Sequence, residues 1–416
     1  MTDAAPTDAA RLSAIRSALR RARRRAIAWA ARATPVLAIT GVLLALVAPA
    51  PPAAAQPMST YARTAFVKDL RSGTVLLDKN ADAPEPPASM SKLMSLFMIF
   101  EALESGRLSM DAEFRTSSRA AALGGSKMFI REGGRVSIED LLRGVIVQSG
   151  NDATVALAEA LAGTEEAFAQ LMNRRAPEIG LHNSYFANST GWPHPDHVMT
   201  ARDLATVAER IIVDFPQYYP MFAEQTFTWE DITQENRNPL LGKVDGADGL
   251  KTGRTKEAGF GLVASAERDG RRIIVVVTGL QSLADRRQEA ERLVNWAFRA
   301  FDTEVLHPAG VPVVEAETWI GDRPSVPLAP ARDVIITAPL GLLEDAVVTA
   351  HFDAPVPAPI ERGQRIGEIR ITVPGVDEPT VVPLQATEEV LPGNFLVRMQ
   401  ASAQLLTRRA LATAGF

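Results

Sequence analysis

The sequence of 416 residues contains no cysteine. This absence excludes thiol catalysis, cysteine-ligated zinc, iron–sulfur clusters and a disulfide framework. Lysine is also scarce, with seven residues against 37 arginines, so the position of each lysine is more informative than usual. Hydrophobic residues make up 46% of the chain and charged residues 22%. These values are close to globular averages and argue against a disordered chain or a polytopic membrane protein.

The length and the charge balance limit the class of protein further. A chain of 416 residues is longer than most single cores, so we expect two domains with accessory segments. The net charge is −5, and residues 1–55 hold eight arginines against two aspartates, which leaves −11 for the remaining residues. An acidic body of this kind argues against a nucleic-acid binder.

The N-terminal segment has the pattern of an export signal. Five arginines within residues 20–25 precede an apolar run from Val36 to Ala48, and Ala53-Ala54-Ala55 offers a small-residue cleavage site. We therefore predict a signal peptide over residues 1–55, with Gln56 as the mature N-terminus. A single membrane anchor is the alternative, although the run is shorter than the roughly 20 residues that a span needs.

From Tyr61 to about Asp302 the pattern alternates between strand-like and helical stretches, which is typical of an α/β domain. Two hairpins are expected, the first over 64–78 and the second over 259–278, the latter turning at Asp269-Gly270. The predicted helices span residues 92–103, 138–144, 153–162, 165–180, 201–214 and 282–301.

After Pro308 the sequence changes to short β-branched runs separated by proline and glycine. The expected strands cover residues 311–315, 333–337, 346–352 and 368–373. This pattern predicts a small all-β sandwich. We therefore divide the chain into an α/β domain over 56–305, a β-sandwich accessory domain over 306–392 and a C-terminal helix over 393–416.

Three short motifs carry residues that are suited to catalysis. Ser89-Met90-Ser91-Lys92 opens an apolar helix, so the lysine lies one turn after the serine on the same face. Lys92 can take the proton of Ser89 if its surroundings lower its pKa. The alternative is that Ser89 only caps the helix and Lys92 is a solvated charge.

The second motif is Ser149-Gly150-Asn151, and the third is Lys251-Thr252-Gly253. The Ser149 hydroxyl could relay a proton, and the Asn151 amide could hold a substrate carbonyl, but Ser-Gly-Asn is also ordinary turn sequence. Lys251 and Thr252 can bind a carboxylate, while Gly253 lets a substrate backbone lie against the strand edge. Each motif occurs once, and coincidence of all three is improbable.

The order Ser-x-x-Lys, Ser-x-Asn, Lys-Thr-Gly resembles the penicillin-recognising serine enzymes, and the flanking residues resemble the low-molecular-mass D-alanyl-D-alanine carboxypeptidases within that group. The flanking segments that carry this likeness are residues 87–94, 124–129, 148–153 and 248–253. The resemblance implies a β-lactamase/transpeptidase-like domain with an antiparallel sheet and a helical subdomain, an all-β accessory domain and a membrane-surface anchor.

The resemblance also implies a role for each motif residue. Ser89 would be the nucleophile toward the penultimate D-Ala of a peptidoglycan stem pentapeptide, Lys92 the general base and Ser149 the proton relay. The substrate-binding residues would be Asn151, Lys251, Thr252, Gly253 and Arg254, and the N–H groups of Ser89 and Arg254 would form the oxyanion hole. No cofactor or metal is implied, and β-lactam antibiotics are expected ligands. Arg254 departs from the family pattern, in which many relatives have histidine.

Other chemistries find less support in the sequence. A β-lactamase or D,D-endopeptidase on the same scaffold, or a peptidoglycan-binding protein with little turnover, remains an alternative. Glu165, Glu166 and Glu178 lie between the second and third motifs, but their helical surroundings do not resemble the deacylating loop of a class A β-lactamase. His194 and His197 form a His-x-x-His pair without a third ligand in register, so polar loop chemistry is favoured over a metal site.

The segment from Asn394 to Phe416 is predicted to form an amphipathic helix. Its apolar stripe comprises Phe395, Leu396, Met399, Ala403, Leu406 and Ala410, and its cations are Arg398, Arg408 and Arg409. Such a helix suits peripheral attachment to an anionic membrane surface, with packing on the β domain or on a second subunit as the alternative. We expect an exported, periplasmic protein on the outer face of the cytoplasmic membrane.

Overall fold

The computed structural model describes residues 58–395 and residue 399. The predicted signal peptide lies outside the described residues, as does nearly all of the predicted C-terminal helix. None of the helices within the described part of the chain is long and apolar enough to cross a bilayer.

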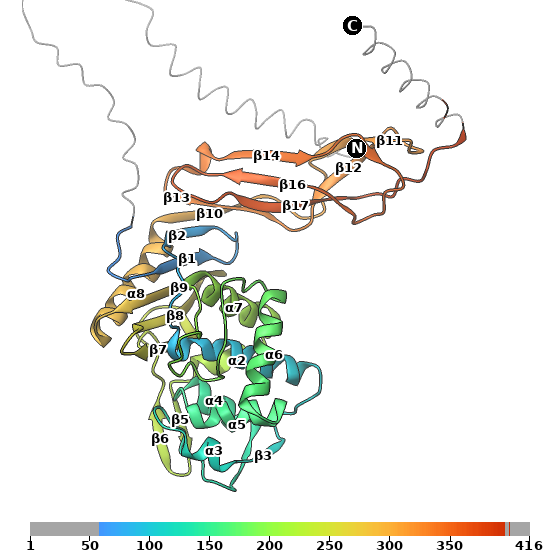
Figure 1. Ribbon diagram of the computed structural model, residues 1–416. Coiled ribbons are helices and arrows are strands. Elements are labelled where there is room, and N and C mark those ends of the chain that lie inside the picture. Colours follow the sequence, from blue (N-terminus) through green and yellow to red (C-terminus); the bar gives the residue numbers. More distant parts are fainter. Residues whose placement is uncertain (1–57, 396–398, 400–416) are drawn as a thin grey trace, which may run out of the picture. The chain divides into compact units, whose positions relative to one another are not determined.

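A five-stranded antiparallel sheet with the order β2-β1-β9-β8-β7 forms the centre of the first region (Figure 1). Its strands are β1 (Ala65–Asp69), β2 (Val75–Lys79), β7 (Ala247–Thr255), β8 (Gly259–Arg268) and β9 (Arg271–Leu280). Both predicted hairpins are confirmed. In the second, Asp269 and Gly270 have φ angles of 50° and 72°, the left-handed values that a tight hairpin turn needs.

All six predicted helices are present, with ends within two residues of those expected. They are α2 (Lys92–Glu104), α4 (Ile138–Ile146), α5 (Asn151–Ala162), α6 (Glu165–Glu178), α7 (Ala201–Asp214) and α8 (Leu283–Arg299). Side-chain caps explain several starts, because the side chains of Ser137, Thr164, Thr200 and Ser282 each accept a backbone N–H in the first turn. The short α3 (Ser118–Ala122) and the single-turn helices η1 (Ala88–Ser91) and η2 (Tyr219–Ala223) were not predicted.

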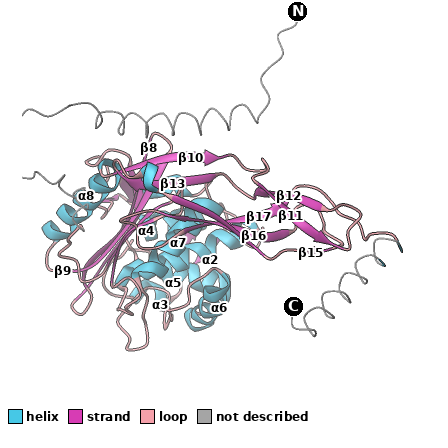
Figure 2. Ribbon diagram, turned by 90° about the horizontal axis from the view of Figure 1, so that it is seen from above, coloured by secondary structure: helices cyan, strands magenta, loops and turns pink. Residues whose placement is uncertain are grey.

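Helices cover both faces of the central sheet (Figure 2). Along β1 the side chains alternate, so that Phe66 joins the core shared with α2 and α4 to α7, whereas Ala65 and Val67 join the core shared with α8. Strands buried on both faces read as continuous apolar runs, as in residues Ile273–Val277 of β9. The α/β class expected from the sequence is therefore confirmed.

Two small hairpins extend the helical layer, and neither was predicted. The first joins β3 (Glu113–Arg115) to β4 (Arg135–Ser137), and the second joins β5 (Thr226–Trp229) to β6 (Ile232–Glu235). Each strand has at most four residues, which is too short for a recognisable alternation.

The region after α8 is all β except for the single-turn helix η3 (Leu343–Asp345), as the sequence predicts. Its strands are β10 (Phe301–His307), β11 (Val314–Trp319), β12 (Ser325–Pro330), β13 (Val334–Pro339), β14 (Val347–Phe352), β15 (Val356–Pro357), β16 (Arg365–Thr372) and β17 (Thr380–Ala386). A six-stranded sheet and the β10–β13 pair share one apolar core. The strand expected over 311–315 instead begins at Val314, and Pro312, which lacks an N–H, lies just before it.

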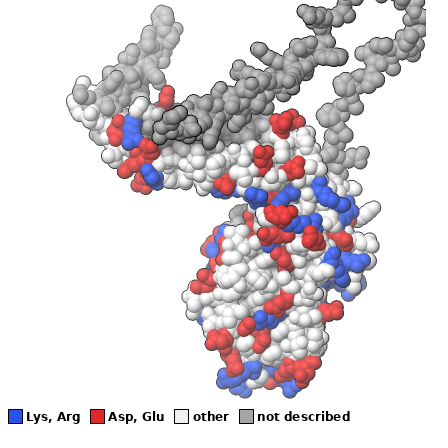
Figure 3. Space-filling model, turned by 180° about the vertical axis from the view of Figure 1, so that it is seen from behind, with Lys and Arg blue, Asp and Glu red and all other residues white. Residues whose placement is uncertain are grey.

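Both signs of charge are interspersed on the described surface that Figure 3 shows. Many charged side chains of the described residues are paired, as in Lys68 with Glu209 and Arg175 with Glu101. These two pairs are partly buried, whereas fully exposed ion pairs contribute little to stability. On this face, the described residues do not form a continuous basic surface.

Candidate active site

Ser89 lies in η1, immediately before α2 begins at Lys92. Its Oγ atom is 2.9 Å from Lys92 Nζ, as expected for two residues one turn apart. Ala88 has a φ of 50°, a left-handed conformation that a residue with a Cβ adopts only at a cost of about 1–3 kcal/mol. The interpretation of Ser89 as a cap with a solvated lysine is wrong, because Lys92 is fully buried and Ser91 is the cap residue of α2.

The surroundings of Lys92 favour a neutral amine. Burial, followed by the charge of Arg237, lowers the pKa of Lys92 to about 7, while Glu165 and Asp152 act in the opposite direction. Its Nζ lies 2.7 Å from Asn151 Oδ1 and 2.5 Å from Thr190 O. A neutral amine can donate its two N–H groups to these oxygens, and its lone pair then remains for the hydroxyl proton of Ser89.

The second motif joins the helical layer to the edge of the sheet. Ser149 has a φ of 60°, so the turn that its sequence predicts is present, and its Oγ accepts a hydrogen bond from Lys251 Nζ at 2.7 Å. The Asn151 amide donates to Gly124 O at 2.9 Å, and its oxygen accepts from Lys92. Ser149 and Asn151 thus each contact one of the two buried lysines.

The third motif lies on β7, which is the edge strand of the central sheet. Lys251 and Thr252 are both buried. A Cβ on Gly253 would lie 2.9 Å from Pro87 O and 3.0 Å from Met90 Cγ, so this position must be small for β7 to pack against η1. Gly253 therefore packs against the turn that carries Ser89, and it also lines the cavity described next.

These motifs meet at a cavity of about 610 Å³. Its walls include Ser89, Ser126, Ser149, Arg237, Thr252, Gly253, Arg254, Phe260, Leu283 and Arg286. Arg237 donates to Ser126 Oγ at 2.5 Å, and the guanidinium of Arg254 lies 4.8 Å from the centre of the Phe260 ring.

Positive charge is concentrated at this cavity. Burial and then the charge of Arg237 lower the pKa of Arg286 to about 10, and burial lowers the pKa of Arg237. Burial also lowers the pKa of Lys251, with further contributions from Lys92, Arg237 and Arg286. The buried Arg286 Nε has no hydrogen-bond partner in the described structure. Within the described residues, no Asp or Glu lines the cavity or pairs with these cations. A site of this kind favours an anion, and a carboxylate suits arginine and lysine donors.

Sequence reasoning missed part of this site. Thr190 contacts Lys92 through its backbone carbonyl, a group that every residue has, so the residue type gives no indication of this contact. Arg237 and Arg286 come from a loop and from α8, without a motif. What sets them apart is that they line the cavity without an acidic partner among the described residues, and a single sequence does not display this.

The His-x-x-His pair lies beside this site in the loop after α6. His197 is buried edge-on against Phe186, with 5.7 Å between ring centres, and burial lowers its pKa to about 4. His194 is more exposed and lies 3.8 Å from Asp196. Within the described residues there is no group of three or more side chains placed to bind a metal ion.

A serine with a lysine one turn away, a second serine and a Lys-Thr-Gly edge strand define the class of penicillin-recognising serine enzymes. The comparison with family models agrees. Residues 51–282 match the D-alanyl-D-alanine carboxypeptidase family, and residues 301–391 match the C-terminal domain of penicillin-binding protein 5. The chain belongs to the D-alanyl-D-alanine carboxypeptidase family.

Individual relatives cover most of the chain. The D-alanyl-D-alanine carboxypeptidase DacC of Escherichia coli is 35% identical over 376 residues, which are 87% of this chain and 93% of the relative. The crystal structure of penicillin binding protein 5 from Haemophilus influenzae covers 80% of this chain and 99% of its own, with 35% identity and a TM-score of 0.74. Penicillin-binding protein D2 from Listeria monocytogenes, in its ampicillin-bound form, covers 58% of this chain and 99% of its own, with 30% identity and a TM-score of 0.54.

Proposed function

We propose that this protein is a serine-type D-Ala-D-Ala carboxypeptidase that removes the terminal D-Ala from peptidoglycan stem pentapeptides. The observation that carries the proposal is the cationic cavity beside the Ser89–Lys92 pair, because none of its described lining residues is an Asp or Glu. A peptide that ends in a free carboxylate supplies the missing charge. Its last peptide bond then lies at Ser89.

In the proposed reaction, Ser89 Oγ attacks the carbonyl carbon of the penultimate D-Ala while neutral Lys92 takes the hydroxyl proton. The backbone N–H groups of Ser89 and Arg254 stabilise the oxyanion. Ser149 passes a proton to the departing amine, so free D-Ala leaves and an ester to Ser89 remains. Water hydrolyses this ester, which releases the shortened peptide and restores the serine hydroxyl.

The binding residues fit this orientation. We assign the terminal carboxylate to Lys251 and Thr252, with Arg237 and Arg286 close by as further cations. Asn151 holds the substrate amide, and the free edge of β7 offers backbone groups to an extended peptide. Gly253 and Arg254 belong to this edge.

We also propose that the protein binds β-lactam antibiotics covalently at Ser89. Support comes from the Listeria monocytogenes relative, whose structure was solved in an ampicillin-bound form. A β-lactam carries a reactive amide and a carboxylate, which are the two groups that the proposed reaction requires.

Mass spectrometry tests both proposals. Incubation with a peptide that ends in D-Ala-D-Ala should shorten the peptide by one residue, and a β-lactam should add its mass to the protein. Ser89→Ala should abolish both. Ser91→Ala should retain both, because within the described residues the Ser91 hydroxyl donates to Ala88 O in the same turn. Covalent labelling of the Ser89→Ala protein would contradict the nucleophile assignment.

We propose, finally, that the protein is exported and attaches peripherally to the outer face of the cytoplasmic membrane. The proposed division is a signal peptide over 1–55, a catalytic domain over 56–305, a β-sandwich domain over 306–392 and an amphipathic helix over 393–416. Deletion of residues 394–416 should move the protein to the soluble fraction without loss of activity on a small peptide. Identical partitioning of the intact and shortened proteins would contradict the attachment.

A further inference from the structure

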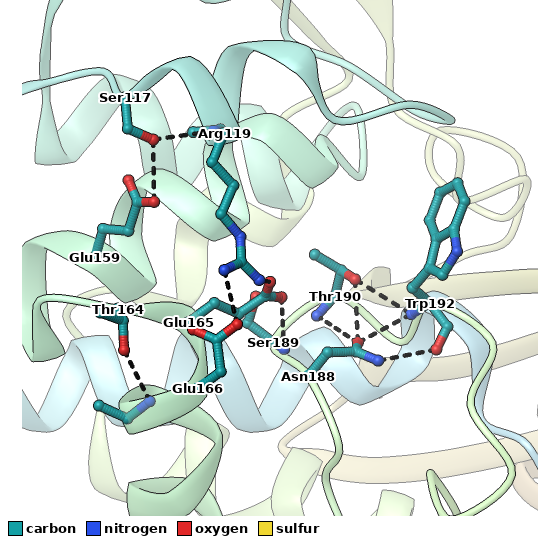
Figure 4. A network of polar contacts seen from close by, with 12 residues as sticks. Ser117, Arg119, Glu159, Thr164, Glu165, Glu166, Asn188, Ser189, Thr190 and Trp192 are labelled. Carbon is teal, nitrogen blue, oxygen red and sulfur yellow. Dashed lines mark hydrogen bonds and ion pairs between the residues drawn. The ribbon is translucent and has the colours of Figure 1, made fainter.

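Glu165 is a buried carboxylate at the beginning of α6, close to the loop that contacts Lys92 (Figure 4). Its Oε1 accepts hydrogen bonds from Ser189 Oγ at 2.7 Å and from Ser189 N at 3.1 Å. Its Oε2 accepts from Arg119 at 2.8 Å. The helix is capped by Thr164, whose Oγ accepts from Ala167 N. Glu165 is therefore held on both carboxylate oxygens.

The loop that Glu165 contacts is bonded to the proposed general base. Ser189 O accepts from Ser95 Oγ at 2.6 Å, and the next carbonyl, that of Thr190, accepts from Lys92 Nζ at 2.5 Å. The loop is closed on itself by Asn188, whose Oδ1 accepts the backbone N–H groups of Thr190, Gly191 and Trp192 (Figure 4). Glu165 and Asn188 together determine where the Thr190 carbonyl lies.

We propose that Glu165 is a positioning residue for Lys92, acting through Ser189 and Thr190 and through its own negative charge. The held carbonyl takes one N–H of the neutral amine, so the lone pair of Lys92 stays directed at Ser89. The charge of Glu165 raises the pKa of Lys92, in opposition to burial and Arg237. The inference rests on the proposed role of Lys92 as the base.

Glu165 is one of several charged or titratable groups that face Lys92. The others come from α5, from the loop before β7, from β7 and from the loop after α6, and they are Asp152, Arg237, Lys251 and His197. Glu165 itself is faced by Arg119 of α3, which also binds Glu166 at 2.7 Å. Glu166 shares the charge and the arginine partner of Glu165, but it is exposed and makes no hydrogen bond to Ser189 in the described structure. It is therefore a matched control.

The test compares Glu165→Gln, Glu165→Ala and Glu166→Gln in the acylation rate by a fluorescent penicillin from pH 5 to pH 9. Glu165→Gln keeps an oxygen for Ser189 but loses the charge, so the acid limb of the profile should move to lower pH by about half a pH unit or more. Glu165→Ala loses the charge and also frees Ser189, so the plateau rate above pH 8 should fall about tenfold or more. Glu166→Gln should match the wild type in both respects.

A second measurement does not depend on catalysis. The chain has seven lysines, so the titration of Lys92 can be followed by NMR of lysines labelled with ¹³C at Cε. The Lys92 titration should move to lower pH in Glu165→Gln and stay in place in Glu166→Gln. If the Lys92 titration did not move in Glu165→Gln, the proposed effect of the Glu165 charge would be wrong. If Glu165→Ala reached the wild-type plateau rate of acylation, the proposed positioning of Lys92 through Ser189 and Thr190 would be wrong. If Ser89→Ala were still labelled by penicillin, the proposed function would be wrong. The NMR titration would still show whether Glu165 affects the pKa of Lys92.

Discussion

Acylation of Ser89 should depend on pH through Lys92, because only the neutral amine can accept the hydroxyl proton. With a pKa of about 7, half of the Lys92 amines are neutral at pH 7, about one tenth at pH 6 and about one hundredth at pH 5. A lysine with the usual pKa of 10.5 would be neutral in roughly three molecules out of ten thousand at pH 7. Burial therefore raises the reactive fraction about a thousandfold.

The assay is the rate constant of acylation at a saturating concentration of a fluorescent penicillin, measured between pH 5 and pH 9. The rate should fall about tenfold for each pH unit below 6.5 and level off above pH 8. Lys251 binds the carboxylate in the proposed scheme, so its deprotonation should weaken binding and leave the rate at saturation nearly unchanged.

Lys92→Arg is the informative variant, because arginine keeps the positive charge and cannot serve as a base. Its acylation rate should be lower by several orders of magnitude at every pH. A wild-type rate that does not vary between pH 5 and pH 8, or one that still rises about tenfold per unit at pH 9, would refute the reasoning. Near-normal acylation of the arginine variant would show that another group takes the proton.

Three further predictions concern stability and substrate binding. Lys92→Met should be inactive yet more stable than the wild type at pH 6 by a few kcal/mol in urea unfolding. The folded pKa of about 7 lies below the unfolded value of 10.5, so the wild type gains stability as the pH rises from 7 to 10.5, and the difference between the two proteins should shrink over that range. Gly191→Ala should lower both the thermal midpoint and penicillin labelling, since its Cβ would lie 1.9 Å from Ala88 O and its φ is +77°. Arg286→Ala should raise KM for a peptide carboxylate about tenfold or more with little change in kcat, whereas a changed kcat with unchanged KM would place Arg286 outside the binding site.

The sequence predicted the parts of the site that depend on local spacing. Ser89 and Lys92 are three residues apart on one helical segment, so their contact follows from helix geometry. The helices were predictable for the same reason, because apolar periodicity and capping residues are local signals. Short strands such as β3 and β5 carry too few residues for that signal.

The contacts that were not predictable join segments far apart in the chain. Ser149 and Lys251 are 102 residues apart, so their hydrogen bond depends on how the helical layer packs on β7. The Thr190 carbonyl and the Arg237 guanidinium reach the site on loops, where neither periodicity nor a motif indicates direction. The close packing of Gly253 on Pro87 was not predictable for the same reason, because the two residues lie on segments far apart in the chain.

The proposed catalytic groups lie on both sides of the contact between the helical layer and the edge strand β7. A molecule in which the helices have opened away from β7 would separate Ser149 from Lys251, even if each layer kept its own secondary structure. Covalent penicillin labelling would then count the molecules in which this contact is closed. In a refolding experiment, labelling should lag behind the recovery of circular dichroism by the time that the two layers need to dock. Penicillin labelling would thereby report whether the contact between the helical layer and β7 has formed.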